Sequence, residues 1–177
     1  CSMSIELTTT AEFLRASHIT RWGIVQTAVR QNIAEHMYRV WTLARAWGPL
    51  VELSPDQQFL AEQLALMHDL PEIRTGDAPT PHKTTELKAH LAQIESQIYP
   101  ELRALEKQAA PATAALVKHC DTAEAVLFLS INGLGTHAQQ VTQLLRQQML
   151  DRLAMSPFTA AQQSALIDAF HTTLHAT

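Results

Sequence analysis

The sequence predicts an all-α protein folded as one helical bundle. The 177 residues include only five glycines, and Ala, Leu and Gln, which favour helices, are abundant. No segment alternates polar and apolar residues with the period of two expected of a half-buried strand. Apolar residues make up 46% of the chain and charged residues 17%, which is typical of a compact domain. We therefore expect residues 1–177 to form a single domain, with Cys1 and Ser2 as a cloning remnant before a native start at Met3.

The first part of the chain is expected to hold a short helix and one long amphipathic helix. Residues 11–16 are predicted to form the short helix, with Phe13 and Leu14 facing inward, and residues 18–31 an irregular segment. Asn32 then has the character of a helix cap, because Glu35 follows at the third helical position. At helical spacing, the inward face of this long helix would comprise Ile33, His36, Met37, Val40, Leu43, Ala44 and Trp47.

The next helix has a strong predicted start at Ser54, a capping residue that is followed by Pro55 and Gln57. It would bring His68 and Asp69 to its C-terminal end, before Pro71 disturbs the helix.

The second half of the chain is also predicted to be helical, in segments separated by proline and glycine. The predicted helices are 84–98, 100–109, 112–131, one capped by Thr136 with Gln139, and one capped by Thr159 with Gln162. The helix 112–131 would bury Leu116, Val117, Cys120, Ala123 and Leu127. Cys120 is therefore expected to be a buried free thiol, without a disulfide framework.

Charge and hydropathy limit the possible partners. A net charge of −4 argues against broad electrostatic capture of nucleic acid or of an anionic membrane. No apolar run approaches the ~20 residues of a membrane span, and no signal peptide is evident. We expect a cytoplasmic protein.

Four side chains are candidate metal ligands on three predicted helices: His36, the adjacent pair His68 and Asp69, and Asp121. A mixed nitrogen and oxygen set suits Zn, Mn, Fe or Co, and Mg more weakly. Glu72 follows one turn later, so it can face the same site without being a ligand. Each candidate also has a structural explanation, since His36 suits a core position and Asp121 could pair with Lys118.

Neighbouring charges are less informative. Lys118 and Glu124 flank Asp121 by one turn each and could orient it or contact a substrate, whereas Arg39 is expected to pair with Glu35. The pair His171 and His175, at i,i+4 spacing, is interpreted as surface.

The ordered motifs resemble those of the HD-domain metal-dependent phosphohydrolases, and in particular the YfbR-like 5'-deoxynucleotidase branch. The similar stretches are Arg21-Trp22, Arg30 to His36, His68 to Glu72, and Thr75 to Lys83, followed by Asp121. The small size and the combination of Trp22 with Ile24 are similar to phage dATP triphosphohydrolases, a type associated with phages whose DNA carries 2-aminoadenine in place of adenine.

This resemblance implies a role for each matching residue. The metal ligands would be His36, His68, Asp69 and Asp121, holding Zn, Co or Mn, with Mg possible on the phosphates. Catalysis would fall to Glu72, Arg21 and Lys83, and substrate binding to Arg21, Trp22, Ile24, Asp77, His82 and Lys83. Glu72 would position the attacking water, and Asp77 would bind the sugar 3'-hydroxyl. Ile24, Trp22 and Asp77 also have structural explanations, as core residues for the first two and as a turn cap for the third.

The implied activity is hydrolysis of dATP to deoxyadenosine and triphosphate, which would deplete dATP. Two alternatives stay open: a 5'-deoxynucleotidase acting on monophosphates, and a non-catalytic nucleotide-binding HD module. By the same resemblance we expect a homo-oligomer, a dimer or a hexamer, located in the host cytoplasm if the protein is phage-encoded.

Overall fold

The structure is a computed structural model that describes residues 5–77 and 84–176, so that Cys1 and Ser2 lie outside the described residues. Its elements in chain order are α1 (Thr10–Phe13), η1 (Leu14–His18), α2 (Ile33–Trp47), η2 (Gly48–Val51), α3 (Pro55–Met67), α4 (Glu72–Thr75), α5 (Thr85–Ile98), α6 (Pro100–Glu106), α7 (Pro111–Asn132), α8 (Gly135–Ala154) and α9 (Ala160–Ala176). The described residues contain only two isolated β-bridges and no β-strand. The predicted all-α fold is confirmed.

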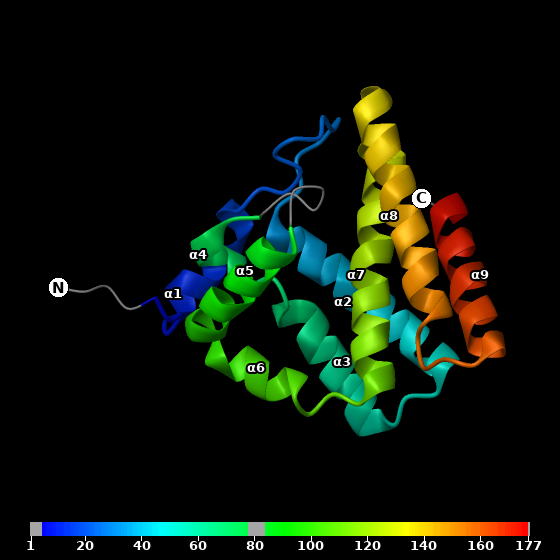
Figure 1. The fold of residues 1–177 in the computed structure, drawn as a ribbon, viewed down its shortest axis with the longest axis horizontal. Helices are drawn as coiled ribbons and strands as arrows, with labels where there is room; N and C mark the ends of the chain where they lie inside the picture. Colours follow the sequence, from blue (N-terminus) through cyan, green and yellow to red (C-terminus); the bar gives the residue numbers. More distant parts are fainter. Residues whose placement is uncertain (1–4, 78–83, 177) are drawn as a thin grey trace.

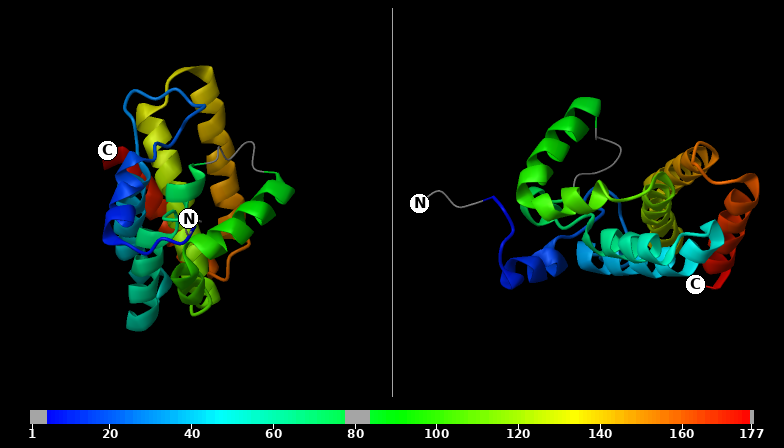
Figure 2. Two further views of the ribbon diagram at one scale, coloured as in Figure 1. Left: turned by 90° about the vertical axis from the view of Figure 1, so that its left-hand side faces the viewer. Right: turned by 90° about the horizontal axis from the view of Figure 1, so that it is seen from below.

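Helix α7 is the central element of the bundle and packs against α2, α3 and α8 (Figure 1). Because neighbours cover it on several sides, most of its residues are buried, including every position predicted to face inward. Cys120 is a buried free cysteine, as expected. Helix α9 lies beside α8 on the side away from the N-terminus (Figures 1 and 2).

Helix α2 has the predicted start and the predicted inward face. The Asn32 side chain accepts from the Glu35 backbone N–H at 2.9 Å, and the Asn32 N–H donates to the Glu35 carboxylate at 3.2 Å. All seven predicted inward residues are buried, and His36 is fully inaccessible to solvent. A polar imidazole at such a position needs partners for both ring nitrogens.

Helices α4, α5 and α6 form the other side of the molecule, where a second, smaller core contains Ile33, Ile73 and Ile98. Figure 2 shows α5 standing away from the α7–α8 pair. The break between α5 and α6 falls before Pro100, as predicted, and α6 ends at Glu106 rather than near residue 109.

Two local predictions are wrong. Leu14 is 71% exposed because α1 ends at Phe13 and the chain continues as a 3₁₀ helix, whose three residues per turn rotate Leu14 away from the core. Thr136 does not cap α8, because this helix begins at Gly135, whose backbone has φ of 76°. The cap formed by Thr159 and Gln162 is present as predicted.

Within the described residues, no helix combines the length and the apolar character that crossing a lipid bilayer requires.

Candidate metal centre and substrate pocket

His68 lies at the C-terminal end of α3, where its backbone N–H still donates to Leu64. Its Nδ1 is 2.9 Å from the Ala65 carbonyl oxygen, which can only accept, so Nδ1 carries the proton. Nε2 is buried, makes no hydrogen bond within the described residues, and has its lone pair available once the ring is neutral. A buried imidazole nitrogen with its lone pair available is what a metal ligand requires.

His36 reaches the same place from α2. Its Nδ1 lies 2.5 Å from Glu124 Oε2, and its Nε2 lies 3.2 Å from Asp121 Oδ1 and 3.4 Å from Asp69 Oδ2. A carboxylate on Nδ1 fixes the ring and directs Nε2 toward the opposite side.

The candidate ligand atoms converge. Atoms from His36, His68 and Asp69 all lie within 4.8 Å of one another. Asp121 Oδ1 is 3.2 Å from His36 Nε2 and 3.8 Å from His68 Nε2. Ligands about 2.1 Å from a tetrahedral ion are about 3.4 Å apart, so the cluster fits a first-row divalent cation after small adjustments. Two imidazoles with carboxylates suit Zn, Mn or Co.

The electrostatics of this cluster favour a cation. Burial opposes a charge on His68, but Asp69 and Asp121 outweigh it and raise the pKa of His68 to about 9. Burial also acts against ionised Asp121, yet Lys118 and the two imidazoles hold the pKa of Asp121 well below its ordinary value. The carboxylates therefore stay ionised and attract positive charge, which a metal can supply in place of the His68 proton.

Asp121 makes both of the contacts that the sequence offered as alternatives, one with Lys118 and one with the ligand cluster. Its Oδ2 accepts from Lys118 Nζ at 2.6 Å, while Oδ1 faces the histidines. Pairing with Lys118 and membership of the ligand cluster are therefore compatible.

Glu124 was expected to orient Asp121 or to contact a substrate, and in the structure it holds His36 instead. It is fully buried on α7, and besides His36 it accepts from Gln31 Nε2 at 2.8 Å and pairs with Arg21 at 3.3 Å and Arg39 at 2.7 Å. Burial raises the pKa of Glu124, but the His36 hydrogen bond and the two guanidinium groups lower it overall. Arg39 was expected to pair with Glu35; the strongly buried negative charge of Glu124 attracts it instead. The available signal was a Glu at an inward position between Ala123 and Leu127.

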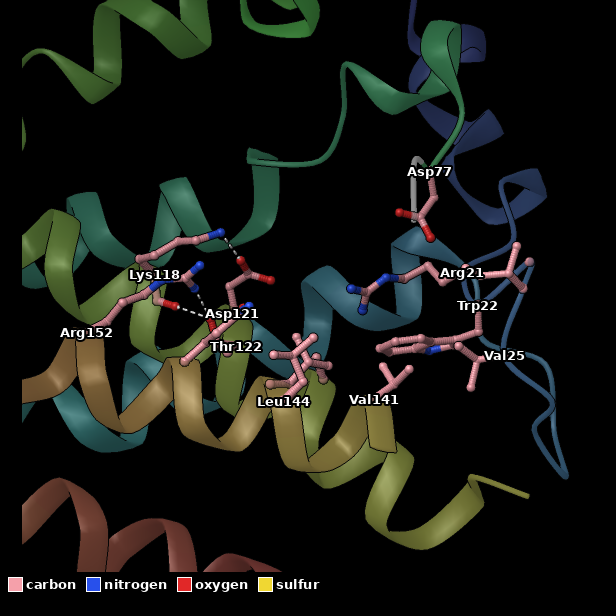
Figure 3. Close-up of a pocket in the computed structure, with 15 residues that line it drawn as sticks. Arg21, Trp22, Val25, Asp77, Lys118, Asp121, Thr122, Val141, Leu144 and Arg152 are labelled. Atoms are coloured by element: carbon pink, nitrogen blue, oxygen red, sulfur yellow. Dashed lines mark hydrogen bonds and ion pairs between the residues drawn. The ribbon is translucent and has the colours of Figure 1, made fainter. Parts of the chain in front are cut away.

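An open pocket adjoins this cluster, between α7, α8 and the irregular segment 19–32. Its lining residues are Arg21, Trp22, Gly23, Ile24, Val25, Asp77, Lys118, Asp121, Thr122, Ala125, Val141, Leu144, Leu145, Gln148 and Arg152. Figure 3 shows the Arg21 side chain directed into the pocket between Asp77 and Asp121, with the Trp22 ring beside Val141.

Trp22 occupies an unusual backbone conformation, with φ of 64°. For a bulky residue this left-handed conformation is strained, and such strain persists only where surrounding contacts enforce it. One ring face stacks parallel to Phe128 at a centroid distance of 6.0 Å, and Nε1 donates to Gln31 Oε1 at 2.9 Å. Because Gln31 also donates to Glu124, hydrogen bonds connect the pocket wall to His36.

The other predicted site residues differ in how far the structure describes them. Ile24 is 43% exposed and lines the pocket, so its interpretation as a core residue is wrong. Glu72 is buried at the start of α4, and its backbone N–H donates to Asp69. His82 and Lys83 lie outside the described residues. The roles assigned to these residues stay predictions.

Comparisons with known proteins agree with this arrangement. A family model described as 5'-deoxynucleotidase YfbR-like matches residues 10–132. A dATP triphosphohydrolase of cyanophage S-2L is 55% identical over 175 residues, which cover 99% of this chain and 100% of that protein. A dATP triphosphohydrolase of Salmonella phage PMBT28 is 34% identical and covers 73% of this chain and 70% of that one.

Among solved structures, the cyanophage S-2L HD phosphohydrolase DatZ, bound to dA and one catalytic Zn²⁺ ion, matches with a TM-score of 0.94. The match has 55% sequence identity and covers 97% of this chain and 99% of that one. The expected HD-domain fold is confirmed.

Proposed function

The chain belongs to the YfbR-like 5'-deoxynucleotidase family, and on that premise we propose that it is a metal-dependent dATP triphosphohydrolase, which cleaves dATP to deoxyadenosine and triphosphate. The observation that carries the proposal is the 55% identity to a phage dATP triphosphohydrolase over nearly the whole of both chains. That match includes α8, which forms one wall of the pocket and lies beyond the family match at residues 10–132.

The proposed metal ligands are His36, His68, Asp69 and Asp121, and the metal is Zn, Co or Mn. When bound, the ion supplies a Lewis acid for the phosphoryl group and lowers the pKa of water. Glu124 keeps the proton of His36 on Nδ1, and Ala65 does the same for His68. Both Nε2 atoms are thereby directed at the metal position, and a bound ion would take the place of the proton on His68 Nε2.

The protein groups around the phosphate have complementary proposed roles. Glu72 accepts or aligns a proton of the attacking water. Arg21 is held by Glu124 and keeps its charge, because Asp69 and Glu124 outweigh the effect of burial and raise the pKa of Arg21. A fixed guanidinium stabilises the negative charge that gathers on the phosphoryl oxygens in the transition state. Lys83 and His82 are proposed as further phosphate contacts.

The nucleoside is proposed to lie toward Trp22. One face of the Trp22 ring is covered by Phe128, and the ring lines the pocket, so it offers a rigid apolar wall to the sugar and base. Asp77, which lines the same pocket, is proposed to accept a hydrogen bond from the 3'-hydroxyl. Ile24 would face the purine edge and leave a 2-amino group without a partner, which disfavours guanine and 2-aminoadenine by ~1–3 kcal/mol.

Selective loss of dATP is the proposed biological result, so that phage DNA carries 2-aminoadenine. The site would then act on the deoxynucleotide pool of the host cytoplasm rather than on nucleic acid. A homo-oligomer, dimer or hexamer, is proposed from the same resemblance.

Product analysis tests the proposal. The four dNTPs and four dNMPs are incubated with Zn, Co, Mn or Mg, and deoxynucleosides, phosphate and triphosphate are separated by ion-exchange chromatography. Triphosphate and deoxyadenosine from dATP, with dGTP spared, are the expected result. Phosphate from several dNMPs, with triphosphates untouched, would instead identify the monophosphate nucleotidase that the family description favours. Binding without hydrolysis would leave only the nucleotide-binding module.

A further inference from the structure

The pocket has two chemically different ends. Figure 3 shows Trp22 and Val25 at one end, Lys118 and Arg152 at the other, and Asp121 between them. The first end has an apolar wall with Arg21 and Asp77 beside it, and the second carries two cationic side chains. A molecule with a flat apolar part and an extended anionic part matches this polarity.

Arg152 is fixed at the cationic end by α7. Its Nη1 donates to Thr122 Oγ1 at 2.9 Å, and the Thr122 hydroxyl in turn donates to the Lys118 carbonyl oxygen at 3.0 Å. The guanidinium is therefore held by a neutral hydroxyl, and its remaining N–H groups can bind another acceptor.

The two cations differ in how far they are neutralised. Lys118 pairs with Asp121 at 2.6 Å, whereas Arg152 makes no ion pair with a carboxylate within residues 5–77 and 84–176. Both side chains line the pocket, and the Thr122 hydroxyl connects Arg152 to the Lys118 backbone. An excess positive charge is thus held on the pocket wall by Arg152 of α8.

We propose that Arg152 binds the terminal phosphates of a nucleoside triphosphate, so that α8 selects triphosphates over monophosphates. This inference rests on the proposed function. With the nucleoside at Trp22 and the first phosphate beside Asp121, the rest of a triphosphate chain extends toward Lys118 and Arg152, which a monophosphate does not reach. The planar guanidinium fork suits two phosphate oxygens at once.

The family match is consistent with this division. It ends at residue 132, before α8 begins at Gly135. The ligand cluster lies within the matched segment, and Arg152 lies outside it. Selection by phosphate chain length is therefore assigned to a helix that the 5'-deoxynucleotidase family description does not cover.

The test compares Arg152→Gln with Arg146→Gln. Both substitutions remove one charge from α8, but Arg146 lies over the Phe170 ring of α9 and does not line the pocket. We expect R152Q to raise the KM for dATP and the Kd for inorganic triphosphate by about tenfold or more, equivalent to about 1.4 kcal/mol. The Kd for deoxyadenosine should change less than about twofold, and R146Q should change none of the three constants.

Calorimetry gives the Kd values in metal-loaded protein, with magnesium in excess over triphosphate, and thermal unfolding checks that the variants are folded. Thr122→Val removes the hydroxyl that positions Arg152 and should weaken triphosphate binding less than R152Q does. R152K keeps the charge and should retain part of the affinity for triphosphate that R152Q loses.

The outcomes separate this inference from the proposed function. Unchanged triphosphate binding in R152Q, in a protein that hydrolyses dATP, would overturn the inference and leave the function standing. Equal loss of deoxyadenosine and triphosphate binding would show a structural role and also overturn it. A wild-type protein that binds triphosphate through Arg152 but does not hydrolyse dATP would support the binding site and refute the function.

Discussion

The two sides of the pocket are built in different ways. On the α2–α3–α7 side, the candidate ligands are buried or half-buried polar groups, and three of the four are held by a second polar group: Glu124 holds His36, Ala65 holds His68 and Lys118 holds Asp121. On the α8 side, the wall is mostly apolar, with Val141, Leu144 and Leu145, and Arg152 carries its one positive charge. The first side lies within the family match and the second outside it. The comparison suggests that the bond-breaking chemistry and the choice of substrate depend on separate helices and can be altered separately.

The largest effect should come from the ligand side. Asp69→Ala removes a candidate ligand, so we expect kcat/KM for dATP to fall at least about 10³-fold, or about 4 kcal/mol of transition-state stabilisation. Bound metal, measured by mass spectrometry of metals after dialysis, should fall in parallel. The control is Asp151→Ala, which removes an exposed carboxylate on α8 that binds Gln147. Full activity in D69A would contradict the metal centre.

A smaller loss of metal binding should follow when a ligand stays in place but loses the residue that orients it. Glu124→Gln keeps the shape of the side chain but removes the charge that orients His36 and balances Arg21 and Arg39. We expect metal affinity to fall about 10–100-fold, as measured by competition with a chelating dye. Glu62→Gln is the matched control, since Glu62 accepts from Trp41 away from the site. Equal metal affinity in E124Q and the wild type would mean that Glu124 serves the fold alone.

On the nucleoside side, a substitution should change which base is accepted rather than the rate of the preferred reaction. Ile24→Ala opens space beside the base, so we expect the preference for dATP over dGTP to narrow about tenfold, from competition between the two substrates. Val29→Ala, an exposed residue of the same segment that does not line the pocket, should leave the preference unchanged. An unchanged preference in I24A would assign base selection to another residue.

The smallest effect concerns an ion pair that belongs to neither side of the pocket, between Glu12 of α1 and Arg74 of α4. Arg74 lowers the pKa of Glu12 from 4.5 to about 2. The pair therefore stabilises the fold fully above pH 4.5, and this contribution is lost as the pH falls through 2. Glu12→Gln should lower the thermal midpoint by about 1–2 °C at pH 6 and by nothing near pH 2, because a pair that solvent still reaches contributes little. The control is Glu86→Gln, which changes an exposed carboxylate on α5 and should not alter the thermal midpoint in a pH-dependent way. If E12Q lowered the midpoint equally at pH 6 and pH 2, the ion pair could not be the cause.

The sequence predicted those features that depend on local spacing. The inward face of α2 follows from a period of 3.6 residues, and the starts of α2, α3 and α9 follow from capping side chains. The contacts of Glu124 with His36 and Arg39 could not be predicted, because they depend on how α7 crosses α2. Glu124 and His36 are 88 positions apart in the sequence. Arg152 was missed for the same reason: only the packing of α8 on α7 brings it to the pocket.

The left-handed backbone at Trp22 has a consequence for which residues this position can accommodate. Glycine or asparagine would suit the backbone, relieving strain of ~1–3 kcal/mol, but neither supplies the ring that stacks on Phe128. Phenylalanine or tyrosine would supply a ring but retain the strain and lose the Nε1 hydrogen bond to Gln31 that helps to enforce it. The position is thus constrained by two opposing requirements. Sequence drift at residue 22 should proceed only together with changes at Gln31 or Phe128, so these three positions are expected to vary as a group among related chains.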